Sequence, residues 1–577
     1  MTRTGFLVVL AVVLFQLAAV AQSDNLDAEK QRQKRLSTLV DQVLSDAASL
    51  KLGENRALVL ARVGNIVWKS DPKRARSMFQ TAVDELINAQ ELAEANAKSM
   101  AGQFELLGQS ARPALLNQIA IHDAAFALET LYRTRPTVLQ RAIAAAGSKS
   151  SKISNLVNNY AYLVQNETAL EQTLMRMAAE QNPERAARIL KESLARGITG
   201  ETLNLLKKLN EKDPDSAAEI AGNMIGKLID QGFMIDNRAD YQKLNLAQSM
   251  LSEFVREKGA DEKYLHIDAD RARTLAEKTI AFYLDQGSRY GYSPAAILPI
   301  AEKLLPASVP RLKQAEKTNP YRSFGYEYDP DATKLLNSNP TAEELIAAAK
   351  RFPEASRTQL YQSAATRYAQ EGNMNAALAV LKDNFADDVL EEAIRNLNFQ
   401  YANNLIGAGK YSEAESAFEE LPESSRFSAY VSLANSIFAA DPEKNKAYAL
   451  AVLSRARGQL PDQPETANDL SWYTQLINVY TNIEPEEAFR MYETMVPQLN
   501  ELADAAAVLG GFQGSGNVRR GEFLLAQGNS FGVYIDFSPL RPLSIKDFDR
   551  TMKLIDGFSR REARILMRLQ LSDYEAN

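Results

Sequence analysis

Residues 358–381 read TQLYQSAATRYAQEGNMNAALAVL, and residues 398–422 read NFQYANNLIGAGKYSEAESAFEELP. In both segments apolar side chains recur every three or four residues, stop at a glycine-containing turn and then recur again. This spacing places the apolar side chains on one face of each helix. The two segments therefore predict two helical hairpins, and the rest of the chain can be compared with them.

The repeated positions follow a fixed order of aromatic, small and larger side chains. The first copy has Tyr361, Ala364, Ala365 and Tyr368, followed by Ala377 and Leu381. The second has Tyr401, Ala402 and Leu405, then Gly409, Tyr411, Ala414, Phe418 and Pro422. Weaker copies have Tyr430, Leu433, Ala434 and Ile437, and then Tyr473, Leu476, Tyr480, Ala488 and Tyr492. Because one amphipathic hairpin cannot bury its apolar stripe alone, such copies are expected to stack into a continuous core.

This order of residues resembles the tetratricopeptide-repeat family, clearly over residues 357–422 and loosely as far as residue 497. Ala377 and Ala414 are 37 residues apart, whereas a regular array repeats about every 34 residues. A composition dominated by Ala, Leu, Glu, Lys and Arg predicts an all-α fold. The uneven period predicts an α-solenoid of irregular stacked hairpins, with a short and less regular C-terminal part. The resemblance implies a scaffold that binds a protein or peptide partner.

A capped junction recurs between helical patterns along the whole chain. It occurs at Asp71-Pro72, Asn182-Pro183, Asp213-Pro214, Asp441-Pro442 and Glu484-Pro485. An Asp side chain can accept a hydrogen bond from a free N–H of the next helix, and proline is well tolerated at the first helical position. An alanine follows four residues later at Ala75, Ala186, Ala217 and Ala488, which predicts close packing between the two helices. At Asp441 that position is Asn445.

The length of 577 residues predicts more than one ordinary core or a long repeat array. We expect an N-terminal helical array over residues 22–317 and a second array over residues 341–509. Between them, residues 318–340 are rich in Pro, Gly, Asn and aromatic residues and are interpreted as a boundary. Residues 510–577 are expected to form a loop and two closing helices, with capping boxes at Ser544 and Ser559.

The first residues are typical of a signal peptide. Arg3 precedes an apolar run from Gly5 to Val20, and Ala19 and Ala21 fit a cleavage site before Gln22. The alternative is an uncleaved membrane anchor, although the run is short for a bilayer. We therefore expect an exported protein, periplasmic or extracellular, with no stable membrane insertion after cleavage of residues 1–21.

The composition limits the chemistry that the chain can perform. There is no cysteine, so disulfides, thiolate metal sites and a cysteine nucleophile are excluded. The formal net charge of −7 argues against a nucleic-acid partner. The two histidines, His122 and His266, begin no spaced ligand motif, so neither a metal site nor a cofactor is expected.

No segment of the sequence has a catalytic pattern that outweighs a structural interpretation. The glycine-rich segment 510–520 lacks the Gly-Lys-Ser/Thr ending of a phosphate-binding loop, and we interpret it as a connector. The alternative function is a cell-envelope glycan-processing enzyme, either similar to lytic transglycosylases or a helical-toroid glycosidase. Its Glu-Ser candidates are Glu192-Ser193, Glu415-Ser416 and Glu423-Ser424, all within helical arrays. A non-catalytic binding protein is the preferred interpretation.

An aromatic cluster flanks the proposed boundary and is the candidate partner-binding site. Its members are Tyr290, Tyr292, Tyr321, Phe324, Tyr326 and Tyr328. Tyrosines at such a place could bind a peptide or stack on a sugar, but aromatic residues also wedge two arrays together, and the wedge is the preferred interpretation. The sequence leaves both roles open.

Overall fold

The structure is a computed structural model. It describes residues 29–96, 111–146, 151–181, 200–233, 238–256, 264–285, 292–317, 330–419, 423–514, 517–528, 531–532 and 534–576. The predicted signal peptide and the junction at Asn182 lie outside these residues, as does most of the proposed boundary. Within them the chain is almost entirely helical, which confirms the all-α prediction.

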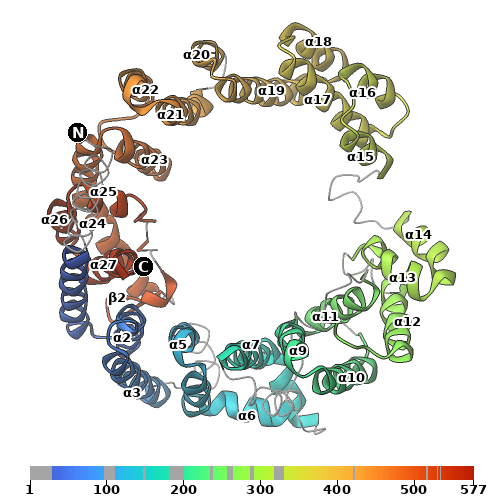
Figure 1. Cartoon of the computed structure of the whole chain (residues 1–577), viewed down its shortest axis with the longest axis vertical. Coiled ribbons are helices and arrows are strands. Elements are labelled where there is room, and N and C mark those ends of the chain that lie inside the picture. The colour runs from blue at the N-terminus through green and yellow to red at the C-terminus, as the bar shows by residue number, and fades with distance from the viewer. Residues whose placement is uncertain are drawn as a thin grey trace, which may run out of the picture.

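The helices form two layers that curve into a ring, as Figure 1 shows. An N-terminal helix over residues 29–48 comes first. The first half of the ring continues with α2 (Gly53–Val67), α3 (Pro72–Asn96), α5 (Arg112–Arg133), α6 (Thr137–Ala146), α7 (Ser151–Gln181), α9 (Gly200–Lys212), α10 (Pro214–Gln231), α11 (Arg238–Val255), α12 (Ala269–Asp285), η2 (Pro294–Ile297), α13 (Leu298–Leu304), η3 (Pro306–Ser308) and α14 (Val309–Lys317). Helices α5, α7, α9 and α11 lie on the inner side, and α3, α6, α10 and α12 lie on the outer side.

The second half of the ring begins inside the proposed boundary 318–340, because residues 330–337 form the helix α15. Its elements are α15 (Pro330–Asn337), α16 (Ala342–Ala349), α17 (Glu354–Gln370), α18 (Met374–Asn384), α19 (Asp387–Gly407), α20 (Tyr411–Glu419), α21 (Glu423–Ala440), α22 (Pro442–Arg457), α23 (Ala467–Ile483) and α24 (Pro485–Gln513). Helices α17, α19, α21 and α23 face inward, whereas α16, α18, α20 and α22 face outward (Figure 1).

The capped junctions place successive helices as the sequence predicts. Asp71, Asp213 and Asp441 each accept a hydrogen bond from a backbone N–H in the first turn of α3, α10 and α22. Glu484 precedes α24 but its side chain makes no cap hydrogen bond, so the predicted cap is absent at that junction. The alanines four residues after Asp71, Asp213 and Glu484 are Ala75, Ala217 and Ala488, and all three are fully buried. Asn445, which replaces the alanine at one junction, donates from Nδ2 to the carbonyl oxygen of Ile437 at 3.0 Å. Asn445 therefore still joins α21 and α22, by a hydrogen bond in place of the close packing of an alanine.

Two local predictions are wrong. Ser544 does not cap a helix, because it lies inside α25 (Leu540–Lys546), and Asp547 instead caps α26 (Phe548–Asp556). The predicted partner of Ser559 is Glu562 of α27 (Arg561–Ala576). Its carboxylate accepts a hydrogen bond from the backbone of Phe523 instead. At Ser544 the nearby Asp547 is the N-cap instead. At Ser559 the expected partner Glu562 binds a distant part of the chain instead.

The segment that was interpreted as a connector contains a short hairpin. Strands β1 (Val518–Arg519) and β2 (Glu522–Phe523) pair antiparallel, and η5 (Leu525–Gln527) follows. The turn between the strands has positive φ at Arg520 and at Gly521. Phe523 is buried, so the hairpin is part of the core.

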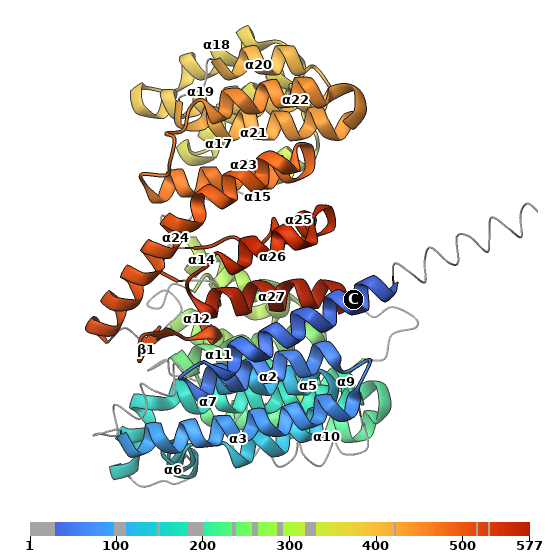
Figure 2. The ribbon, with the colours of Figure 1, turned by 90° about the vertical axis from the view of Figure 1, so that its left-hand side faces the viewer.

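One hydrophobic core joins the two ends of the chain and closes the ring. It combines Leu39 and Val43 of the N-terminal helix with Phe523, Ile565 and Leu569 from the last part of the chain. Figure 2 shows the N-terminal helix and α27 side by side at this junction. Asp46 forms ion pairs with Arg564 and Arg568, so charge pairs surround the apolar seam.

Candidate functional site

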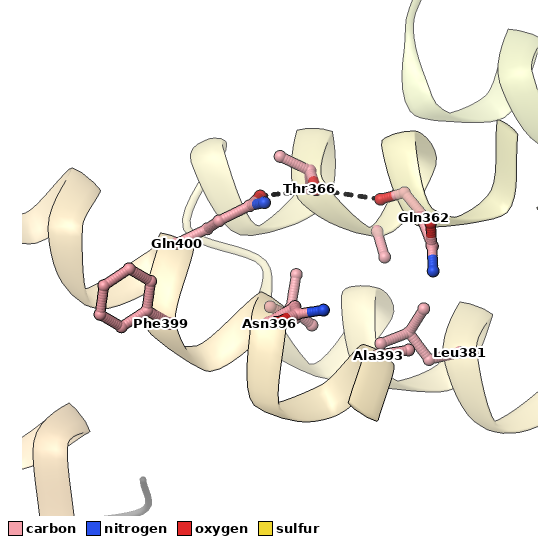
Figure 3. A pocket seen from close by; sticks show the side chains of 9 residues that line it. Gln362, Thr366, Leu381, Ala393, Asn396, Phe399 and Gln400 are labelled. Atoms are coloured by element: carbon pink, nitrogen blue, oxygen red, sulfur yellow. Dashed lines mark hydrogen bonds between the residues drawn. The ribbon is translucent and has the colours of Figure 1, made fainter. Parts of the chain in front are cut away.

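The candidate site is a pocket between α17 and α19, with α18 at its base (Figure 3). Its volume is about 170 Å³. Leu381 of α18 is 1% exposed and forms the floor. In the ring, α17 and α19 lie on the inner side and α18 lies on the outer side (Figure 1).

Two glycine turns lie beside the helices that form this pocket. Gly372 has φ +82° in the turn between α17 and α18, and Gly409 has φ +72° in the turn between α19 and α20. Asn373 then caps α18 by accepting a hydrogen bond from the N–H of Ala376 at 3.2 Å. The small residues Ala365 and Ala393 face the cavity, and their short side chains leave the space that a larger residue would fill.

The polar groups that line the pocket are uncharged. They are Gln362 and Thr366 from α17, and Asn396 and Gln400 from α19. The hydroxyl of Thr366 lies 3.0 Å from the Gln400 Oε1 atom, and it also lies within hydrogen-bond distance of the Gln362 carbonyl oxygen. Figure 3 shows these side chains on both helices around the opening. No Asp, Glu, Lys, Arg or His is among the residues that line this pocket.

Amide side chains suit the recognition of a polypeptide backbone. Each carries two N–H donors and an oxygen acceptor, so it can pair with a peptide C=O and N–H at once. This chain already uses the arrangement internally, where Asn55 donates to the Phe523 carbonyl at 2.8 Å and accepts from the Leu525 N–H at 2.9 Å. The same chemistry at Gln362 and Asn396 is open to solvent.

An apolar contact adjoins the amides. Phe399 lines the pocket and is 41% exposed, while Leu397 beside it is buried. An exposed aromatic ring next to a cavity provides contact area that loses little conformational entropy on binding. The pocket therefore combines backbone-type hydrogen bonding with space for one apolar side chain.

The structure places one of the six predicted partner-binding residues. Tyr292 lies against Phe282 and Tyr283, with ring centroids 6.1 and 5.8 Å away, and packs on the core of the first half. Burial raises the pKa of Tyr283 to about 12, and the neighbouring Tyr292 makes a smaller contribution in the same direction. Tyr290, Tyr321, Phe324, Tyr326 and Tyr328 lie outside the described residues, so a binding role for the cluster stays a prediction.

The pocket between α17 and α19 was not singled out from the sequence. Gln362, Thr366, Asn396 and Gln400 recur at helical spacing beside the buried alanines, but the same pattern is typical of any solvated helix face. What distinguishes them is the juxtaposition of two helices, which the spacing within one helix does not reveal. The one sequence feature that could have indicated this pocket is the run of uncharged polar side chains on both α17 and α19.

Other candidates have structural surroundings. His122 stacks on Trp68 with ring centroids 4.7 Å apart, and burial lowers its pKa. Glu415 accepts a hydrogen bond from Tyr448 and pairs with Arg455 at 2.6 Å. In the described ranges no three His, Cys, Asp or Glu side chains come together in a way that could hold a metal ion. None of the helices described has the length and apolarity needed to cross a membrane.

Comparisons with known proteins add little. No protein-family model matches the sequence, and a search of curated proteins gives no match. One similar solved structure is described as a "Circular tandem repeat protein with novel repeat topology and enhanced subunit contact surfaces". It is 12% identical, with 94% of this chain and 98% of that chain covered and a TM-score of 0.17. A TM-score this low carries no functional argument.

Proposed function

We propose that this chain is an exported helical-repeat protein that binds an extended segment of another protein, or a peptide, and that it has no catalytic activity. One observation carries the proposal: the pocket between α17 and α19 has amides on both walls and no charged lining residue. The resemblance of the same segment to tetratricopeptide repeats supports a polypeptide ligand. Export rests on the apolar N-terminal run in the sequence.

The amides favour a polypeptide over an ionic ligand. An anionic or cationic ligand needs an opposite charge in a partly buried site, and this pocket offers none. A peptide backbone is neutral and presents C=O and N–H groups along its length, which amides can match at several points. Side-chain selectivity would come from Phe399 and the cavity floor at Leu381.

A glycan-processing enzyme would need two facing carboxylates about 5 to 9 Å apart. The pocket between α17 and α19 has no carboxylate in its lining, so it cannot perform that reaction. Glu415, one of the sequence candidates, is paired with Arg455 and Tyr448.

Peptide display against the chain starting at Gln22 tests the proposal. We expect enriched peptides whose binding weakens in Gln362→Ala/Asn396→Ala, because each lost neutral hydrogen bond is worth about 1 kcal/mol and two give roughly a 30-fold loss. A matched control is Gln370→Ala/Asn404→Ala, which removes exposed amides from α17 and α19 outside the pocket. Equal weakening in both double variants, or peptides that bind neither helix, would contradict the proposal.

A further inference from the structure

A second surface lies far from the peptide pocket, where the N-terminal helix meets the turn between α2 and α3. A groove of about 460 Å³ runs between them and ends at Ala576 near the C-terminus. Its floor is apolar, with Leu36 and Val40 on one side and Ile66 and Val67 on the other. We call this surface the basic groove and define it by these four residues together with Lys69 and Arg74.

Positive charge gathers around the basic groove although the whole chain is acidic. Three cations, Arg32, Lys69 and Arg74, line it against two carboxylates, Glu29 and Glu575. Lys34 of the N-terminal helix and Lys73 in the first turn of α3 add two exposed positive charges near it. The formal net charge of the chain is −7, so a local excess of cations departs from the average surface. An uneven distribution of this kind attracts a partner of opposite charge.

The acidic residues nearby are already engaged. Glu29 pairs with Arg32 at 2.9 Å, and Asp71 caps α3 by accepting a hydrogen bond from the backbone N–H of Arg74. Glu575 pairs with Arg35 at 3.6 Å. Within the described residues, the exposed side chains of Lys34, Lys69 and Lys73 form no ion pair. Three lysines are thus available to an external anion.

The position of the groove in the chain indicates which anion. The groove begins at Glu29, and only residues 21–28 separate it from the apolar run that ends at Val20. Eight residues span at most about 30 Å when fully extended. Whenever that run is in a bilayer, the basic groove is therefore held within about 30 Å of the lipid headgroups.

We propose that the basic groove docks on an anionic lipid surface. Lys69 and Lys73 contact the headgroups beside the groove, and Lys34, on the exposed side of the N-terminal helix, adds to the positive potential. The apolar floor at Leu36, Val40, Ile66 and Val67 accepts an acyl chain that leaves the surface. The contact is peripheral, since it uses the sides of folded helices and inserts no helix. It would hold the ring beside the membrane after the leader is removed, with the peptide pocket on the distant arc between α17 and α19 (Figure 1).

Vesicle flotation tests this proposal with the chain that starts at Gln22. We expect binding to vesicles of equimolar phosphatidylcholine and phosphatidylglycerol and no binding to phosphatidylcholine alone. Each lysine near an anionic surface contributes about fivefold in partitioning, so Lys34→Gln/Lys69→Gln/Lys73→Gln should weaken binding on the order of 100-fold. Binding should also fall with added salt, because the Debye length shortens.

The matched control is Lys278→Gln/Lys350→Gln/Lys382→Gln, which changes the net charge equally at exposed lysines elsewhere in the ring. It should bind the mixed vesicles like the parent chain, and both triple variants should keep its melting temperature. Equal loss in both variants, or binding to neutral vesicles, would overturn the proposal. The proposal would also be overturned if a chain starting at Glu29 bound the mixed vesicles and the chain starting at Gln22 did not. Residues 22–28 would then be the segment that occupies the basic groove. A dimer that the first triple variant dissociates would assign the groove to a second copy instead.

Discussion

The carboxylate of Glu522 accepts a hydrogen bond at 3.0 Å from the backbone N–H of Leu52, which lies 470 residues earlier in the chain. Leu52 is the N-cap residue of α2, and its own side chain cannot cap a helix. The N–H of Lys51 donates to the same carboxylate. The last part of the chain therefore supplies the cap that the first part lacks.

Replacing this cap should loosen the seam of the ring. In Glu522→Ala the N–H groups of Lys51 and Leu52 lose their acceptor, and an unsatisfied buried donor costs about 1 to 3 kcal/mol. Hydrogen exchange in peptides from the first turn of α2 should then accelerate about 5- to 150-fold. The control is Glu501→Ala, on an exposed position of α24, which should leave exchange there unchanged. An unchanged rate in Glu522→Ala would show that the cap contributes nothing to closure.

A buried charge network should be the most sensitive polar feature of the first half. Glu167 of α7 pairs with Arg112 and Arg135 of the α5 region, both at 2.7 Å, and all three side chains are buried. Glu167→Gln leaves two guanidinium groups with less compensating charge, and such changes cost about 3 to 5 kcal/mol. Glu180→Gln on the same helix breaks an exposed pair with Arg176 and should cost at most about 1 kcal/mol. Chemical denaturation compares the two variants, and equal midpoints would contradict this difference.

Acid should reduce the contribution of the same network. Burial alone would raise the pKa of Glu167, but hydrogen bonds and charge from Arg112 and Arg135 outweigh burial and lower the pKa below the ordinary value for a glutamate. A carboxyl with a depressed folded pKa stabilises above its unfolded pKa, and the stabilisation is lost as pH falls through the folded pKa. The free-energy difference between the parent chain and Glu167→Gln should therefore be constant above about pH 5 and shrink below about pH 4.5. A free-energy difference that grows as the pH falls would mean that folding raises the pKa of Glu167, which would contradict this prediction.

Two glycines with the same backbone angle should differ in how much stability is lost when each is replaced by alanine. Gly532 and Gly372 both have φ +82°, yet a Cβ on Gly532 would lie 2.0 Å from the Cβ of Ala506, and one on Gly372 would meet nothing within 4 Å. Gly372→Ala should cost about 1 to 2 kcal/mol for the left-handed backbone alone. Gly532→Ala adds the clash with α24 and should cost clearly more. Thermal unfolding of the two variants measures the difference, and equal losses would show that the segment shifts freely.

Binding at the pocket between α17 and α19 should be insensitive to salt and pH. No ionisable side chain lines the pocket, so screening and protonation of the chain have no direct target there. For a displayed peptide without ionisable groups, the affinity should stay constant between about pH 5 and pH 8. A steep fall in affinity with added salt would place the peptide on another surface. The basic groove is expected to show that steep fall.

The sequence predicted the hairpins because their signals are local. Asp213 and Pro214 fix the start of α10, and Ala217 one turn later is buried against its partner helix. These effects depend on residues within one or two turns, so they can be read without knowing what lies across the ring. Asn445 shows the limit, since its amide contact with Ile437 replaces the close packing of an alanine.

What the sequence could not predict depends on contacts between distant segments. Glu562 has the spacing of a capping residue, yet it binds the backbone of Phe523 because the hairpin lies on α27. The pocket beside Thr366 exists because α17 and α19 face each other across two alanines. Neither arrangement leaves a signal in the spacing of residues along one helix. The closure of the ring likewise depends on contacts between distant segments and could not be predicted from the sequence.

The shared core of the two ends has a consequence for synthesis. Leu39 and Val43 are translated long before Ile565 and Leu569, which belong to the same core. Until α27 has been made, the N-terminal helix must keep part of its apolar face unprotected, which invites aggregation. A helix near one end of the ring therefore acquires its complete packing only when a helix about 500 residues later in the chain has been synthesised.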